Sequence, residues 1–85
     1  MITLADMMKS GRAAEGQEYL HSRTKNSVCR LAEISDGGVY LTHLRGDSPP
    51  INGSSYLKRL QHVSFHAMPA EYKDFILVND RKNLM

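Results

Sequence analysis

The fold is decided by residues 27–45, which read SVCRLAEISDGGVYLTHLR. Two runs rich in apolar side chains, 27–34 and 38–45, stand on either side of a short turn that contains Asp36 and Gly37. An Asp-Gly pair between two such runs is a strong hairpin signal, because both central residues of a type I′ turn need positive φ. The stretch therefore predicts an antiparallel β-hairpin closed by a two-residue loop.

The loop length sets the register of this hairpin and so decides which side chains share a face. On one face we expect the opposing pairs Ile34 with Val39, Ala32 with Leu41, Arg30 with His43, and Val28 with Arg45. On the other face we expect Glu33 with Tyr40, Leu31 with Thr42, and Cys29 with Leu44. Both faces are then partly apolar, which indicates that both are partly covered. A three-residue loop would shift the register and mix the two sets.

The residues before the hairpin favour helices. Residues 3–10 predict a short helix with Thr3 as its N-cap and Asp6 completing a variant of the capping box. A second helical stretch is expected over 12–22, although Gly16 inside it costs about 1 kcal/mol relative to alanine.

The residues after the hairpin alternate between loop and structure. The two prolines and two glycines of 45–55 predict a loop, and a serine at its end could cap a short helix over 56–60. Polar and apolar residues then alternate over 61–67, which predicts a strand. Residues 70–79 suit a short helix, whereas Phe75–Val78 alone suits a buried strand, so both alternatives remain open.

These elements together predict an α+β fold. We expect a short N-terminal helix or helix pair packed on a small antiparallel sheet of three to four strands. A compact SH3-like barrel is the alternative. The 85 residues are too few for two domains, so 1–85 is read as a single small domain. Its 41% hydrophobic and 24% charged residues are typical of a globular protein.

Several classes of protein are disfavoured by the composition. Cys29 is the only cysteine and cannot form an intramolecular disulfide, and the N-terminus lacks the pattern of a signal peptide. The longest apolar run, Phe75–Val78, is far too short to cross a membrane. We therefore expect a cytoplasmic protein that does not associate with membranes. A chain this small without disulfides must pack tightly or find a partner, so a homodimer is also considered.

The side chains needed for catalysis are scarce. Cys29 lies mid-strand among apolar residues, where a buried, inert thiol is the ordinary expectation. The sequence contains neither a Gly-x-Ser-x-Gly elbow nor a glycine-rich phosphate loop. We therefore expect neither enzymatic activity, nor catalytic residues, nor a cofactor.

Metal binding is disfavoured by the spacing of the histidines. His62 and His66 are four residues apart and would lie about 13 Å apart along a strand, too far for one ion. Only the tertiary fold could bring His43 and Cys29 together. No metal site is therefore expected.

Binding of nucleic acid is the leading functional prediction. In the expected register, Arg30, His43 and Arg45 gather on one face of the hairpin, and Lys58 and Arg59 follow the loop. Such cations suit phosphate contacts rather than base reading. The opposing consideration is that eleven Lys and Arg face nine Asp and Glu, a net charge of only +2. Any positive field must therefore come from clustering, and Lys58 and Arg59 also suit the solvated face of a short helix.

The alternative is a protein-interaction module or a homodimeric accessory or regulatory protein. Three of the five methionines lie within the first eight residues, and methionine gives an adaptable apolar surface. Leu4, Met7 and Met8 then form either part of the core or a partner-binding surface. Phe75–Val78 raises the same question, because an exposed apolar edge strand invites association.

Overall fold

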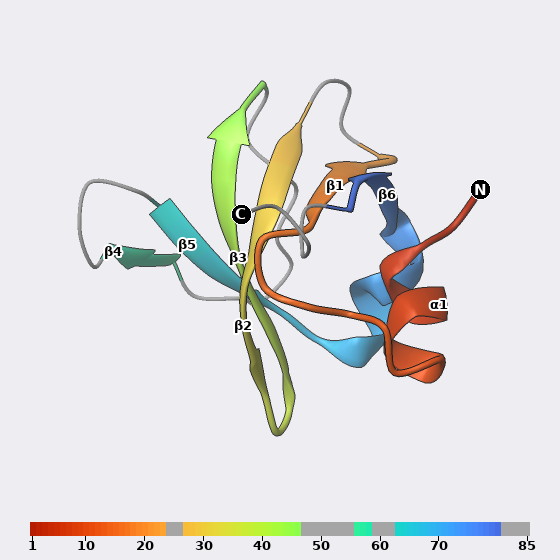
Figure 1. Ribbon diagram of the computed structural model, residues 1–85. Helices are drawn as coiled ribbons and strands as arrows, with labels where there is room; N and C mark the ends of the chain where they lie inside the picture. Colours follow the sequence, from red (N-terminus) through yellow and green to blue (C-terminus); the bar gives the residue numbers. More distant parts are fainter. Residues whose placement is uncertain (24–26, 47–55, 59–62, 81–85) are drawn as a thin grey trace.

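The computed structural model describes residues 1–23, 27–46, 56–58 and 63–80 (Figure 1). The elements in chain order are α1 (Leu4–Lys9), β1 (Glu18–His21), β2 (Val28–Ser35), β3 (Gly38–Arg45), β4 (Tyr56–Lys58), β5 (Val63–Ala67), the 3-10 helix η1 (Pro69–Asp74) and β6 (Phe75–Asn79). The fold is α+β, as predicted. No helix among the described residues is long and apolar enough to span a membrane.

The strands form one antiparallel sheet in the order β4-β5-β3-β2-β1-β6. It has six strands rather than the predicted three to four. Strands β4 and β6 lie at its two ends and do not pair with each other, so within the described residues the sheet stays open rather than closing into a barrel. The hairpin of β2 and β3 projects from the rest of the sheet at its turn (Figure 1).

The predicted hairpin is confirmed, but its turn differs from the expected type. Ser35 pairs with Gly38 across a two-residue loop. Gly37 in that loop does not adopt the positive φ that a type I′ turn requires, so the expectation of a type I′ turn was wrong. Instead, the Ser35 hydroxyl donates a hydrogen bond of 2.9 Å to the carbonyl oxygen of Gly38, which ties the two strand ends together.

Two bulges change the register along the hairpin. The predicted pairs hold next to the turn and at the far end: Ile34 with Val39, Glu33 with Tyr40, and Val28 with Arg45. Between them, β2 inserts Ala32 and β3 inserts Leu44, so neither has an opposing residue. The pairs between the two bulges are Leu31 with Leu41, Arg30 with Thr42, and Cys29 with His43.

The expected pairs Ala32–Leu41, Arg30–His43, Leu31–Thr42 and Cys29–Leu44 were therefore wrong. An inserted residue leaves its strand out of step with its partner until a second insertion on the partner restores the register. Alternation of apolar residues does not reveal such an insertion when both faces are partly apolar.

One face of the sheet, the inner face, forms the core together with α1 and η1. Figure 1 shows these two helices side by side next to β6. The core consists of Leu4, Met7, Tyr19, Cys29, Leu31, Val39, Leu41, Phe65, Ala67, Tyr72 and Phe75. Met8 of α1 is half-buried and packs against this cluster. The opposite face of the sheet is called the outer face below.

The N-terminal helix begins as predicted. The Thr3 hydroxyl accepts a hydrogen bond of 3.2 Å from the backbone N–H of Asp6, and the Asp6 carboxylate accepts one of 2.9 Å from the N–H of Thr3. This is the expected capping box. Because these bonds favour the charged carboxylate, they lower the pKa of Asp6.

The second predicted helix, over 12–22, is wrong. Gly16 takes a φ of +97°, a left-handed conformation that interrupts a helix, and Glu18–His21 form β1. Along β1 the buried Tyr19 and His21 alternate with half-buried residues, the two-residue period of a strand. Pairing with β2 on one side and β6 on the other outweighs the local helix preference.

Gln17 holds the irregular segment before β1 in place. Its side-chain oxygen accepts hydrogen bonds of 2.9 Å from the N–H of Ala14 and from the hydroxyl of Tyr19. Its amide nitrogen donates bonds of 3.0 Å to the carbonyl oxygen of Arg12 and to the Asp80 carboxylate. Gln17 is completely buried with all of these bonds made, which is what a buried amide requires.

The C-terminal half combines the two alternatives left open for 70–79. Residues 69–74 form η1 and residues 75–79 form β6, so the helix and the strand follow one another. The predicted strand over 61–67 is confirmed as β5, although residues 61–62 lie outside the described residues. The helix predicted over 56–60 is wrong, because its first three residues form β4. Most of the predicted loop over 45–55 lies outside the described residues.

Candidate nucleic-acid interface

The two bulges decide which predicted cations share a face of the hairpin. β2 runs without interruption from Val28 to Leu31, so Val28 and Arg30 share a face, and Arg45 opposes Val28. Arg30 and Arg45 therefore both lie on the outer face, and both are exposed. His43 opposes Cys29, a core residue, and so lies on the inner face. Its predicted place beside Arg30 was wrong.

The other two predicted cations lie beyond the hairpin. Lys58 is the last residue of β4 and pairs with Val63 of β5. Strands β5 and β3 stand between β4 and β2 in the sheet. Arg59 lies outside the described residues. Arg30 and Arg45 are thus the predicted pair that the hairpin brings together.

The outer face also carries two rings that were not among the predicted site residues. Tyr40 opposes His66 on β5, and the two ring centroids are 4.8 Å apart with the planes tilted by 55°. Both residues are half-buried. Tyr40 is two residues before Thr42, which opposes Arg30, so it shares the outer face with Arg30. Without the bulge at Ala32, Tyr40 falls on the opposite face. For His66, the alternation with the apolar Phe65 and Ala67 in the sequence could have indicated that its side chain lies on the face opposite the core.

The imidazole of His66 is held in place from two sides. A Cβ atom on Gly38 would overlap the carbonyl oxygen of Ala67 and lie 2.9 Å from Cε1 and Nε2 of His66. Glycine is needed at this position because β5 and the His66 ring approach the backbone of β3 so closely. The Ser35 hydroxyl lies 3.4 Å from Nε2 of His66.

Charge and burial are uneven over the outer face. Neither Arg30 nor Arg45 forms an ion pair within the part of the chain that the structure describes. Glu33, which opposes Tyr40, brings one exposed carboxylate to the turn end of the face. Val28 and Thr42 on the same face are buried. A second carboxylate, that of the half-buried Glu18 on β1, stands directly opposite Arg30 on this face. Among the described residues, the charged and aromatic groups of the outer face are thus the two arginines, the Tyr40–His66 pair, Glu33 and Glu18.

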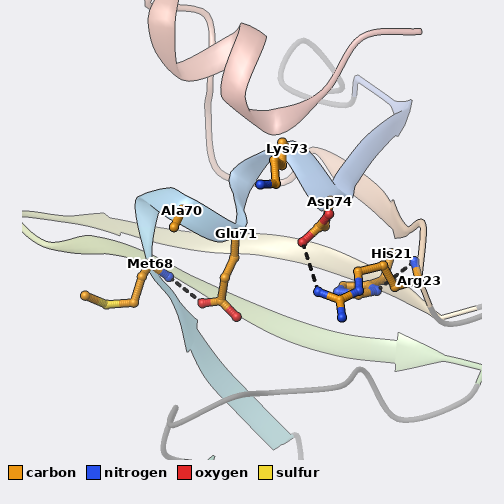
Figure 2. A pocket seen from close by; sticks show the side chains of 7 residues that line it. All are labelled: His21, Arg23, Met68, Ala70, Glu71, Lys73 and Asp74. Carbon is orange, nitrogen blue, oxygen red and sulfur yellow. Dashed lines mark hydrogen bonds and ion pairs between the residues drawn. The ribbon is translucent and has the colours of Figure 1, made fainter.

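A second candidate site is a pocket between the end of β1 and η1, with a volume of about 310 Å³ (Figure 2). Its lining residues are His21, Arg23, Met68, Ala70, Glu71, Lys73 and Asp74. Two of these side chains are cationic and two are anionic, so the pocket does not select ligands of one charge. No group of three or more His, Cys, Asp or Glu residues that could hold a metal ion occurs among the described residues.

Four of the polar side chains of this pocket already have partners within the fold. Nη1 of Arg23 lies 3.8 Å from Oδ2 of Asp74, and Glu71 accepts a hydrogen bond of 2.8 Å from the N–H of Met68. Nδ1 of His21 accepts a bond of 3.2 Å from the N–H of Arg23. Because His21 is buried, its pKa is lowered and its neutral form is favoured. These groups stabilise the junction of β1 and η1 rather than offering free contacts.

Cys29 is placed as the sequence predicts, in the middle of a buried strand. Its side chain is completely buried, and burial raises the pKa of its thiol to about 11. A thiol with this pKa stays protonated at neutral pH and is a poor nucleophile. His43 opposes Cys29, so the fold does bring these two residues together. The raised pKa keeps the Cys29 thiol protonated, and a protonated thiol is a poor metal ligand.

Comparison of the chain with protein-family models, with curated proteins and with solved structures finds no match.

Proposed function

We propose that this protein is a small, non-enzymatic, cytoplasmic binding protein that contacts nucleic-acid phosphates through Arg30 and Arg45. The observation that carries the proposal is that these two exposed guanidinium groups share the outer face of one hairpin and form no ion pair within the described residues. Guanidinium groups bind phosphate oxygens through paired, charge-assisted hydrogen bonds. Lys58 and Arg59 remain predicted contributors to the same interface. The buried thiol of Cys29 supports the non-enzymatic part of the proposal.

The proposal is tested by equilibrium binding at low salt. Fluorescence anisotropy of labelled single-stranded and double-stranded oligonucleotides is measured for the wild type and for Arg30→Ala/Arg45→Ala. The control is Arg12→Ala/Lys73→Ala, which removes the same charge from exposed positions outside the outer face. We expect the first double variant to bind more weakly than the control while both stay folded. Absence of binding by the wild type to every probe would refute the proposal.

A protein-interaction module or homodimer is the second candidate, and the edge of the sheet favours it. The carbonyl of Ile2 accepts a hydrogen bond of 2.8 Å from the N–H of Leu77, and Thr3 bridges Ile76, so the N-terminus lines the outer edge of β6. Met1, Ile2 and Val78 are 98%, 43% and 50% exposed at this edge. Because the N-terminal segment already pairs with this edge at Ile76 and Leu77, association here would use the exposed apolar side chains rather than free backbone groups. The buried Met7 makes α1 a poorer candidate for such a surface.

Light scattering coupled to size-exclusion chromatography tests this second candidate. A dimer that Val78→Lys converts to a monomer would support association through the β6 edge, because a buried lysine without a partner is costly. A wild-type protein that remains monomeric at high concentration would eliminate the homodimer.

A further inference from the structure

We infer that the outer face of the sheet stacks an unpaired base on Tyr40 and His66, so that the ligand is a single-stranded nucleic acid. This inference rests on the proposed function and adds the class of ligand to it. Proteins that bind single strands combine cations along the backbone path with aromatic rings on which bases stack. The outer face has both features: Arg30 and Arg45 for phosphates, and a ring pair at its turn end.

The two rings are placed for contact with a ligand rather than with the core. They lie on the face opposite α1 and η1, and each remains half-buried rather than enclosed. Their planes are tilted by 55°, so they do not cover each other's faces as parallel stacked rings do. A planar base can therefore lie against a ring face that the partner ring leaves accessible.

The ring pair is also held in one position before any ligand arrives. His66 is seated where a side chain on Gly38 would stand, and Ser35 lies beside its Nε2 atom. Tyr40 is placed against it by direct pairing of β3 with β5. A binding surface that is already ordered loses less conformational entropy when it captures a ligand.

The charged residues indicate where the phosphate backbone of the bound single strand crosses the outer face. Tyr40 is diagonal to Arg30 in the hairpin, and diagonal neighbours lie about 7–8 Å apart, within reach of long side chains. The carboxylate of Glu33 stands opposite Tyr40 and repels phosphates from the turn end, and the half-buried Glu18 of β1 stands opposite Arg30 and weakens the positive field there. The backbone is therefore expected to run over Arg30 and Arg45 while a base points toward the rings. Duplex bases have their faces inside the stack and cannot make this contact without being flipped out.

The test compares a labelled oligonucleotide, as DNA and as RNA, with the duplex of the same sequence. Tyr40→Leu removes the ring, and Tyr40→Phe keeps it as a matched control. We expect Tyr40→Leu to weaken single-strand binding about 5- to 150-fold, the loss associated with one base–aromatic stack. Tyr40→Phe is expected to bind within about threefold of the wild type, since stacking needs only a π-face. Duplex binding should be weaker and unaffected by either change.

A second measurement on the wild type keeps the inference testable if Tyr40→Leu unfolds. Proton NMR should show upfield ring-current shifts of the Tyr40 and His66 ring protons when the single strand is added. Equal binding of single strand and duplex, with no effect of Tyr40→Leu and no such shifts, would overturn this inference and leave the phosphate-binding proposal intact. Binding to none of the probes would instead refute the proposed function itself.

Discussion

Replacing Gly38 with alanine perturbs the contact between β3 and β5 on which the position of His66 depends. An alanine Cβ would overlap the carbonyl oxygen of Ala67 and lie 2.9 Å from two atoms of the His66 ring, whereas ordinary contacts lie at 3.4–4 Å. The imidazole can rotate away, but the carbonyl belongs to the backbone of a paired strand and moves only with β5. Overpacking of this kind costs about 1–3 kcal/mol. For a domain of this size, each kcal/mol lowers Tm by about 4–8 °C.

The assay is thermal and urea unfolding followed by circular dichroism, with Gly37→Ala as the matched control. Gly37 is the neighbouring glycine; a Cβ there meets no atom within 4 Å, and its φ is not positive. Gly37→Ala should therefore leave stability unchanged or raise it by about 0.4–1 kcal/mol through the lower entropy of the unfolded chain. Equal stabilities of the two variants would refute the reasoning that β5 lies against Gly38 too closely for a side chain.

Three further predictions concern the rest of the fold. Thr3→Ala should destabilise the protein by about 1 kcal/mol in urea unfolding, because it removes the N-cap of α1; an unchanged midpoint would contradict the capping box. The Cys29 thiol, with its pKa raised to about 11, should react with a disulfide reagent at neutral pH only after unfolding; rapid labelling of the native protein would contradict its burial. The pKa of His21 is lowered below 6.5 by burial, so the unfolded chain takes up a proton that the folded protein resists. The free energy of unfolding should therefore fall as the pH drops from about 7 to 5, and His21→Phe should reduce that slope; an equally steep slope in the variant would assign the effect to other groups.

The hairpin and the first helix could be predicted because their signals are local. An Asp-Gly turn between two apolar runs and the Thr3–Asp6 capping box each depend on residues within a few positions of one another. The strand at 18–21 could not be predicted in this way. Its residues suit a helix locally, and they become a strand because β2 and β6 supply hydrogen-bonding partners on both sides.

The candidate site was predicted only in part for a related reason. Arg30 and Arg45 were correctly assigned to one face, because the second bulge restores the register by the time β2 reaches Val28. His43 was misassigned because it lies between the two bulges, where the register is shifted by one residue and the faces are exchanged. Tyr40 keeps its predicted partner Glu33, and it was missed because the bulge at Ala32 moves Arg30 onto the face that Tyr40 occupies. Because both faces of this hairpin are partly apolar, the pattern of apolar residues fits a regular register and a bulged register equally well.

The salt dependence of nucleic-acid binding tests the central claim most directly. The logarithm of the binding constant of the wild type is measured against the logarithm of the salt concentration, and compared with that of Arg30→Ala/Arg45→Ala. If both arginines contact phosphates, binding should weaken steeply with salt, and the double variant should show a slope shallower by about 1 for each arginine removed. A variant slope equal to that of the wild type, or a wild type that binds no probe at low salt, would contradict the account.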